Sequence, residues 1–195
     1  NLDPAPKEGF GLVGIEQWGS IQWQTMDYAF DRAYVLEAYT ATDVPDLSQV
    51  TSMQAMFNLA YVFNGDISGW NVGAVTNMRL MFSGTYAFNQ DISGWNVSNV
   101  TDISLMFFLT EAFNQDLNDW DVGAVTNMEG VFNSATAFNQ DISGWNVGKV
   151  TNMELMFLGA TSFDQNLGGW NISSVSSMKG MFNNSGMDAQ TRMTQ

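Results

Sequence analysis

A spacing of 25 residues dominates this sequence and restricts what it can fold into. Tryptophan, phenylalanine and valine each recur at that interval through most of the chain. The recurring positions are Trp70, Trp95, Trp120, Trp145 and Trp170; Phe57, Phe82, Phe107, Phe132, Phe157 and Phe182; and Val50, Val75, Val100, Val125, Val150 and Val175. A fixed period of this size indicates a repeat array, in which each unit buries its apolar face against its neighbours.

The apolar spacing inside one unit predicts a short strand followed by a short helix. The spacing of a leucine-rich-repeat strand and its flanks is found at Ile67, Trp70, Val72 and Val75. Asn71 lies between two apolar residues and would point to the opposite side of such a strand. The segment 75–82 has apolar residues at helical spacing. We therefore expect an α/β repeat solenoid, a right-handed leucine-rich-repeat-like coil with one parallel β-sheet face and short helices on the other.

The regular repeats are flanked by segments that depart from the pattern. Residues 1–45 contain a proline-bearing entry segment and a degenerate repeat, which we interpret as an N-terminal cap. The array is predicted to occupy 46–186, and a tail without the pattern follows at 187–195. The chain starts with Asn1 and no cap is visible after the last repeat, so a processed or excised chain is expected.

Charge and composition exclude several classes of function. Six Lys and Arg stand against 20 Asp and Glu, so the net charge is −14. This field repels nucleic-acid phosphates and anionic membranes, and no apolar run approaches the roughly 20 residues of a membrane span. The chain has no cysteine and no histidine. Thiol nucleophiles and the commonest general base are therefore absent, and we expect no enzyme activity and no cofactor, with calcium as the one alternative.

The repeat motif resembles that of a known class of surface proteins. Phe-Asn-Gln-Asp-Ile-Ser-Gly-Trp-Asn-Val occurs at 88–97 and again at 138–147, followed by Val-Thr-Asn-Met and Met-Phe. These runs are similar to the BspA-like leucine-rich repeats of bacterial surface proteins, also found in mycoplasma surface lipoproteins. The resemblance covers roughly residues 12–186. It implies an extracellular or cell-surface protein of adhesion or host contact, with no catalytic residues.

One polar row is predicted to form the ligand-binding face of the strand sheet. Its members, one from each unit, are Asp46, Asn71, Asn96, Asp121, Asn146 and Asn171. As the outward position of each expected strand, the row would offer a polar surface to an extended partner. The alternative is a ladder of side-chain amides that binds nothing.

A second row stacks carboxylates and raises the question of a metal. It consists of Asp66, Asp91, Asp116 and Asp141, and it ends in Asn166. Carboxylates about 5 Å apart would repel by roughly 3 kcal/mol per pair at an effective dielectric constant of about 20. Calcium would offset this, helped by the asparagines two residues earlier. We favour the alternative, an Asx turn in which each Asp accepts local backbone amides.

The remaining candidates are interpreted mainly as structural. The Trp column is expected to lie in the core rather than to bind carbohydrate, and the Met column to fill gaps there. One unit is unusually acidic because it combines Asp116, Asp119 and Asp121. We interpret this as drift, with a ligand site or a hydrolase centre as weaker alternatives.

The predicted function is a cell-surface interaction or adhesion module. It would bind a protein or a glycan on another cell or matrix through the strand face. The alternative is a structural subunit that assembles end to end into a filament or surface layer, because an uncapped repeat end is a template for association.

Overall fold

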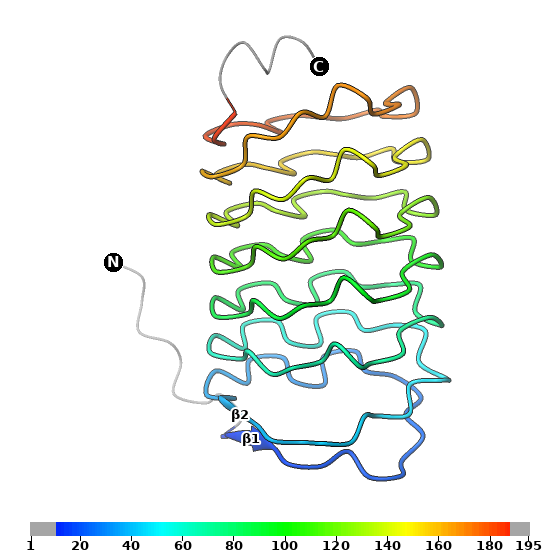
Figure 1. Ribbon diagram of the computed structural model, residues 1–195, viewed down its shortest axis with the longest axis vertical. Helices are drawn as coiled ribbons and strands as arrows, with labels where there is room; N and C mark the ends of the chain where they lie inside the picture. The colour runs from blue at the N-terminus through cyan, green and yellow to red at the C-terminus, as the bar shows by residue number, and fades with distance from the viewer. Residues whose placement is uncertain (1–10, 188–195) are drawn as a thin grey trace.

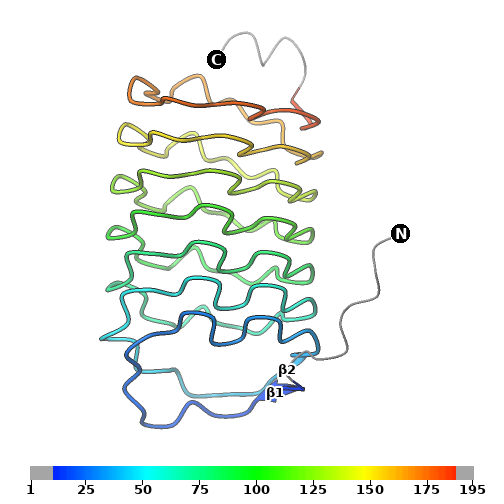
Figure 2. The same cartoon turned by 180° about the vertical axis from the view of Figure 1, so that it is seen from behind.

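Residues 11–187 are described by the computed structural model, and they form a stack of similar coils (Figure 1). Viewed from behind, the coils above the irregular N-terminal end keep a similar outline up the stack (Figure 2). Parallel β-bridges connect them in steps of 25 residues: Ser52↔Asn77, Asn77↔Asp102, Asp102↔Asn127, Asn127↔Asn152 and Asn152↔Ser177. The period in the sequence is therefore also the period of the backbone.

The only regular secondary structure within 11–187 is a two-stranded sheet at the N-terminal end of the stack. Strand β1 is Gly14–Ile15 and strand β2 is Ala38–Tyr39. They pair in parallel, with Gly14 opposite Ala38 and Ile15 opposite Tyr39. No helix is present in this part of the chain. The prediction of an α/β solenoid with short helices is therefore wrong.

The segment predicted as a helix bonds to the neighbouring coil instead of to itself. Every second backbone N–H of this segment donates to a carbonyl of the next coil at 2.9–3.0 Å: Met78 to Asp102, Leu80 to Ser104 and Phe82 to Met106. The β-bridges also lie in this segment, at Asn77 and its equivalents. It is the most regularly hydrogen-bonded wall of the stack, and we call 76–85 and its equivalents the ladder wall.

The intervening N–H groups of the ladder wall close tight turns. The amide of Met81 donates to Met78 and that of Ser83 to Leu80, at 3.2 and 3.1 Å. Leu80 has a φ of 58° and Gly84 a φ of 69°, each at the third position of its turn. An α-helix needs a negative φ throughout and i→i−4 bonds, so this conformation excludes one.

The parallel sheet expected at 70–72 is also not formed. Trp70 donates its backbone N–H to Ile67, and Val75 donates to Val72, so this segment too is a run of turns. No bridge of the described residues involves it. The leucine-rich-repeat geometry is therefore wrong in both halves of the unit, although the inward direction of Trp70 and Val72 and the exposure of Asn71 agree with the alternation.

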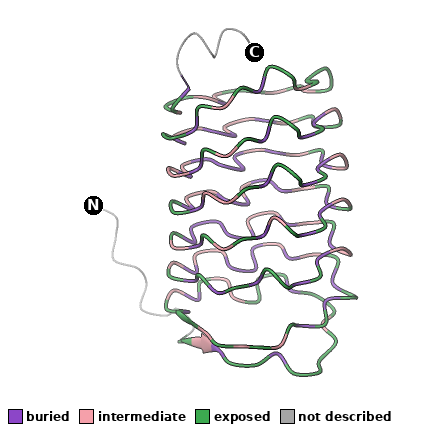
Figure 3. Cartoon of the chain, in the orientation of Figure 1, coloured by how far each residue is buried: buried purple, intermediate pink, exposed green. Residues whose placement is uncertain are grey.

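Buried residues recur in every coil of the stack (Figure 3), and among them is a double column of phenylalanine rings. In the first column successive rings are 5.2–5.8 Å apart: Phe30, Phe57, Phe82, Phe107, Phe132, Phe157 and Phe182. In the second they are 5.9–6.2 Å apart: Phe63, Phe88, Phe113, Phe138 and Phe163. Offset stacking at such separations is favourable. Five coils thus contribute an aromatic pair to the same two places, and Phe30 and Phe182 extend the first column alone.

The Trp and Met columns are structural, as the sequence indicated. From Trp95 onward, each indole N–H of the column donates to a carbonyl of the preceding coil, as from Trp95 to Ile67 at 3.2 Å and from Trp145 to Leu117 at 2.8 Å. These bonds satisfy a polar group that would otherwise be buried without a partner. Met153 and its equivalents in the middle of the stack are fully buried, and only Met178 at the end is exposed.

Candidate functional site

The predicted binding row lies along one side of the stack, and every member is exposed. We call Asp46, Asn71, Asn96, Asp121, Asn146 and Asn171 the lateral row. In each case Oδ1 accepts the backbone N–H two residues further on, at 3.0–3.2 Å. This is an Asx turn, which holds the side chain in one orientation.

The amide nitrogens of the lateral row are unused within residues 11–187. Asn71, Asn96, Asn146 and Asn171 donate no hydrogen bond from Nδ2 to any residue of that part of the chain. The oxygen is therefore committed to the turn, while the two N–H groups remain. The row presents fixed donors once per coil, a chemistry that suits hydrogen-bond acceptors on a partner.

The second predicted row forms Asx turns as well. Asp66, Asp91, Asp116 and Asp141 each accept the backbone N–H two residues on, at 2.8–3.0 Å, and Asn166 does the same. The pKa of Asp66 and of Asp141 lies below the ordinary value, chiefly because the backbone amide of the serine two residues on donates to the carboxylate. For Asp91 the hydroxyl of that serine has the larger effect on the pKa.

The asparagines two residues before each Asp of the second row, which were considered as calcium ligands, form hydrogen bonds between coils. Oδ1 of Asn89 accepts the backbone N–H of Asn114 at 2.9 Å and Nε2 of Gln115 at 2.9 Å. The same pair of bonds recurs with Asn64, Asn114 and Asn139 as acceptors. These side chains connect successive coils outside the ladder wall. Sequence reasoning missed this role, although the invariant Asn-Gln pairing at 89–90, 114–115 and 139–140 was its signal.

The acidic residues do not converge on a metal-binding group. Within 11–187 there is no group of three or more acidic side chains that could hold a metal ion. Asp116, Asp119 and Asp121 of the acidic unit are all exposed. Asp116 and Asp121 each accept a local amide, from Asn118 and Gly123. Nothing in this geometry distinguishes the acidic unit as a catalytic centre.

A tyrosine column, half-buried at Tyr34 and Tyr61 and exposed at Tyr86, is a surface feature that the sequence reasoning missed. Tyr34, Tyr61 and Tyr86 stack with ring centroids 5.0 and 5.1 Å apart. Burial between its neighbours raises the pKa of Tyr61, and the charges of Tyr86 and Tyr34 act in the same direction. The column ends where Glu111 takes the equivalent position. The 25-residue interval between Tyr61 and Tyr86 was its signal.

The pKa values of the second row predict how stability depends on acid. A carboxylate with a lowered pKa in the folded protein stabilises it above the unfolded pKa, and that contribution is lost as the pH falls through the folded pKa. We expect the free energy of unfolding to fall below about pH 4. Replacing Asp66, Asp91 and Asp141 by asparagine should flatten this fall, because Asn166 shows that the amide keeps the turn.

Urea unfolding at a series of pH values between about 2 and 7 tests this. The result to compare is the difference between the triple variant and the wild type, since acid also relieves repulsion arising from the net charge of −14. A variant that loses stability in acid as steeply as the wild type would show that these three carboxylates are not the cause.

Comparisons with known proteins place the chain in a family without assigning an activity. No curated protein and no solved structure matches it. Within 11–187 there is no helix long and apolar enough to cross a membrane. A family model described as "Mycoplasma protein of unknown function" matches residues 24–125 and again residues 94–194, so the two matches cover most of the chain. The match does not extend to the BspA-like leucine-rich class. The chain belongs to the DUF285 family of Mycoplasma proteins of unknown function.

Proposed function

We propose that the protein is a bacterial cell-surface interaction module that binds a protein or a glycan through the lateral row. The observation that carries this proposal is the pair of free N–H groups on each row asparagine, held outward by the Asx turn. Donors that are fixed before binding lose little conformational entropy when a partner arrives. Their repetition up the stack suits an extended partner with regularly spaced oxygen acceptors.

The net charge of the chain limits the chemical classes of partner that it can bind. At a net charge of −14, anionic glycans and acidic peptides are repelled, whereas neutral glycans and basic peptides are not. The resemblance of the repeat motif to bacterial surface-protein repeats is the reason for locating the module outside the cell. We propose no catalytic role, because Asp116, Asp119 and Asp121 of the acidic unit are exposed, and two of them are engaged in turns.

Binding to printed arrays of neutral oligosaccharides and of basic peptides tests the proposal. The informative variant replaces Asn71, Asn96, Asn146 and Asn171 by aspartate. Asp121 already forms the same turn, with Gly123 N–H at 3.0 Å from its Oδ1, so the fold should persist. The variant removes all the Nδ2 donors of the row. We expect at least a tenfold loss of binding, roughly the effect of 1.4 kcal/mol.

A control variant keeps the row and adds the same charge elsewhere. Gln17→Glu, Gln49→Glu, Asn118→Asp and Ser162→Asp lie at exposed positions outside the row. This control should bind as the wild type does. Equal binding by the row variant, or no binding of the wild type to either array, would contradict the proposal.

A further inference from the structure

The C-terminal end of the stack exposes groups that every interior coil buries. Met178 is 46% and Ile172 37% exposed, whereas their equivalents Met153 and Val147 are 0% and 1% exposed. Together with Trp170, Met181 and Phe182 they line a hollow of about 360 Å³. This end therefore presents an apolar core cross-section that belongs against another coil.

The same end also presents a row of unpaired backbone donors. In the coil before it, Met153, Leu155, Phe157 and Gly159 donate their N–H groups to Ser177, Lys179, Met181 and Asn183. The equivalent donors in the last coil are Met178, Gly180, Phe182 and Asn184. None of these four donates to a residue within 11–187.

The N-terminal end presents the matching acceptors. The first coil donates upward, for example from Tyr28 to Gln54 and from Phe30 to Met56. The carbonyl groups of this coil that point away from the stack are those of Thr25, Asp27, Ala29 and Asp31. They accept no hydrogen bond from the described residues. Phe30 begins the phenylalanine column, with one face on Phe57 and only part of the ring buried. The two ends of the stack are thus complementary, donors at one and acceptors at the other.

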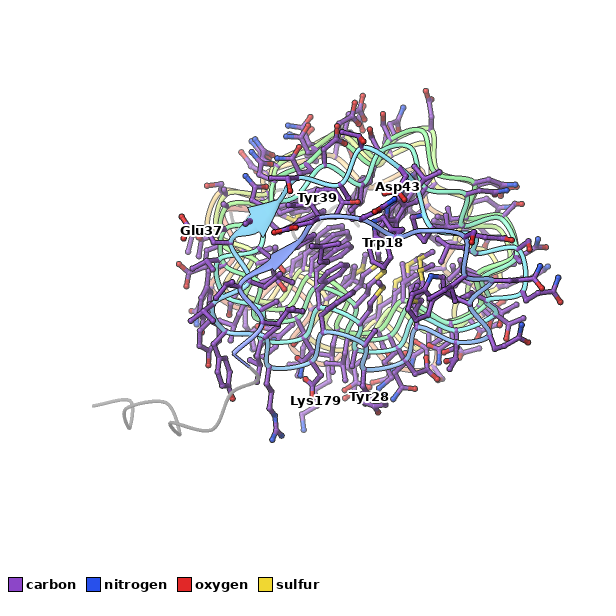
Figure 4. The ribbon with its side chains drawn as sticks, turned by 90° about the horizontal axis from the view of Figure 1, so that it is seen from below. Trp18, Tyr28, Glu37, Tyr39, Asp43 and Lys179 are labelled. Atoms are coloured by element: carbon purple, nitrogen blue, oxygen red, sulfur yellow. The ribbon has the colours of Figure 1, made fainter. Side chains whose placement is uncertain are left out.

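The side chains at the two ends have opposite charges in the same column. Tyr28, Ala55, Leu80 and Gly180 share the left-handed turn position, so the residue before each marks one column. That column begins with Asp27 and ends with Lys179. Viewed along the stack, Lys179 and Tyr28 lie beside each other at the same edge (Figure 4). A copy placed on the end in register would therefore bring Lys179 to the Asp27 of its neighbour.

We propose that the protein associates head to tail with a second copy of itself, with the C-terminal end of one stack on the N-terminal coil of the next. Phe182 then stacks on Phe30, as Phe157 stacks on Phe182 at 5.7 Å within the chain. Asn183 comes to lie beside Asp31, on the side opposite the one where Asn58 Nδ2 donates to Asp31 at 2.7 Å. Lys179 pairs with Asp27.

Such an interface uses two different surfaces and leaves both ends of the product open. A heterologous contact of this kind extends without closing when the rotation per copy is small. Mass therefore grows past the dimer as the concentration rises. A symmetric contact between two C-terminal ends would instead stop at the dimer. This growth is independent of the lateral row, which lies along the side of the stack.

Sedimentation and light scattering over a concentration series test the proposal, with charge reversal at the two ends. The Lys179 side chain is exposed and makes no hydrogen bond or ion pair within 11–187, so Lys179→Asp should leave the fold intact. Association should weaken by about tenfold or more, because the change places like charges together. The double variant Asp27→Lys with Lys179→Asp should recover it. Lys149→Asp, an equal change on the exposed side of an interior coil, should have no effect.

Disulfide crosslinking tests the register in which one copy lies on the next. Introduced cysteines are the only ones present, because the natural chain contains no cysteine. Thr25 and Ser177 lie in one column, the same one as Ser52 and Asn77. Mixing a Thr25→Cys protein with a Ser177→Cys protein under mild oxidant should yield the covalent heterodimer. Ser173→Cys, exposed on the side of the last coil, should not crosslink with Thr25→Cys.

Three outcomes would overturn the proposal. A constant monomer mass at all concentrations would show that the C-terminal end is covered or inert. A mass that stops at the dimer would assign a symmetric contact. If the Ser173→Cys control crosslinked as readily as Ser177→Cys, the proposed register between the two copies would be wrong. The pairing of Lys179 with Asp27 depends on that register and would be wrong as well.

Discussion

Replacing Phe107 by alanine is expected to lower the free energy of unfolding by about 3–5 kcal/mol, the usual cost of removing a buried phenylalanine. Its ring is 1% exposed and stacks between Phe82 and Phe132, at 5.8 and 5.6 Å. Within its own coil it also packs on Phe113 at 4.2 Å. The substitution would interrupt the first column in the middle of the stack and leave a cavity with rings above, below and beside it.

The cavity has little freedom to collapse, which places the expected cost at the high end. The backbone on either side is held by inter-coil hydrogen bonds from Leu105 to Glu129 at 2.8 Å and from Phe107 to Val131 at 2.9 Å. The neighbouring rings cannot move together unless these bonds break. Because each coil contacts only its two neighbours, a weak middle coil also uncouples the two halves of the stack.

Urea unfolding followed by tryptophan fluorescence measures this loss. The matched control is Phe182→Ala, the same change at the end of the same column, where one ring face has a neighbour and the side chain is only partly buried. We expect a clearly smaller loss there. Equal losses for the two variants, or a loss below about 1.5 kcal/mol for Phe107→Ala, would show that stacking in the column does not determine stability.

The sequence was sufficient to predict the period and the inward columns. A residue that recurs every 25 positions must occupy the same place in each coil, so the burial of Trp95, Phe107 and Val100 followed without any knowledge of secondary structure. It was insufficient for the backbone between them. Apolar residues at i, i+3, i+6 and i+7 face one side in a helix, and here they also face one side in a succession of four-residue turns.

The helix and the succession of turns differ in the carbonyl groups to which alternate backbone N–H groups donate. The polarity of the side chains contains no information about these hydrogen bonds. The available signal was glycine, since Gly84 and Gly130 lie at turn positions with φ values of 69° and 58°. At the equivalent of Gly130 the earlier coil has Leu105, also with positive φ. Leucine rarely adopts this conformation and therefore argued for a helix. The inter-coil bonds of the ladder wall hold it there.

The candidate site was predictable in position but only partly in chemistry. The exposure of Asn71 and its equivalents followed from alternation, and the Asx turns at Asp66 followed from the known preference of Asp for its own backbone. The inter-coil role of Asn89 did not, because it depends on which coil lies above. Sequence patterns indicate contacts between residues two to four positions apart, whereas the hydrogen bond from Asn114 N–H to Asn89 Oδ1 spans 25 residues.

The second large effect is expected where the repeat pattern is broken near the N-terminal end. Gly65 stands where later coils have glutamine, as at Gln90 and Gln115. A Cβ at this position would lie 2.5–2.8 Å from three atoms of the Tyr39 side chain, which fills the space. We expect Gly65→Ala to cost about 2–4 kcal/mol, combining overpacking with the loss of hydrogen bonds that Tyr39 makes.

Those hydrogen bonds explain why Tyr39 cannot move aside cheaply. Its hydroxyl oxygen accepts the indole N–H groups of both Trp18 and Trp70, at 3.1 and 3.3 Å. The two tryptophans are 6% and 4% exposed, so neither N–H can turn to water. One displaced ring therefore leaves two buried donors without a partner, and the junction between the first coil and the array weakens.

Thermal and urea unfolding of a small set of variants isolates this contact. Gly94→Ala is the matched control, because a Cβ there meets nothing within 4 Å and the backbone is not left-handed. It should be neutral or stabilising by about 0.4–1 kcal/mol through the unfolded state. Combining Gly65→Ala with Tyr39→Ala should cost much less than the sum of the two, because the clash disappears with the ring. Additive losses would mean that glycine is required at position 65 only for its backbone conformation. The space that Gly65 leaves for the Tyr39 ring would then not stabilise the junction between the first coil and the array.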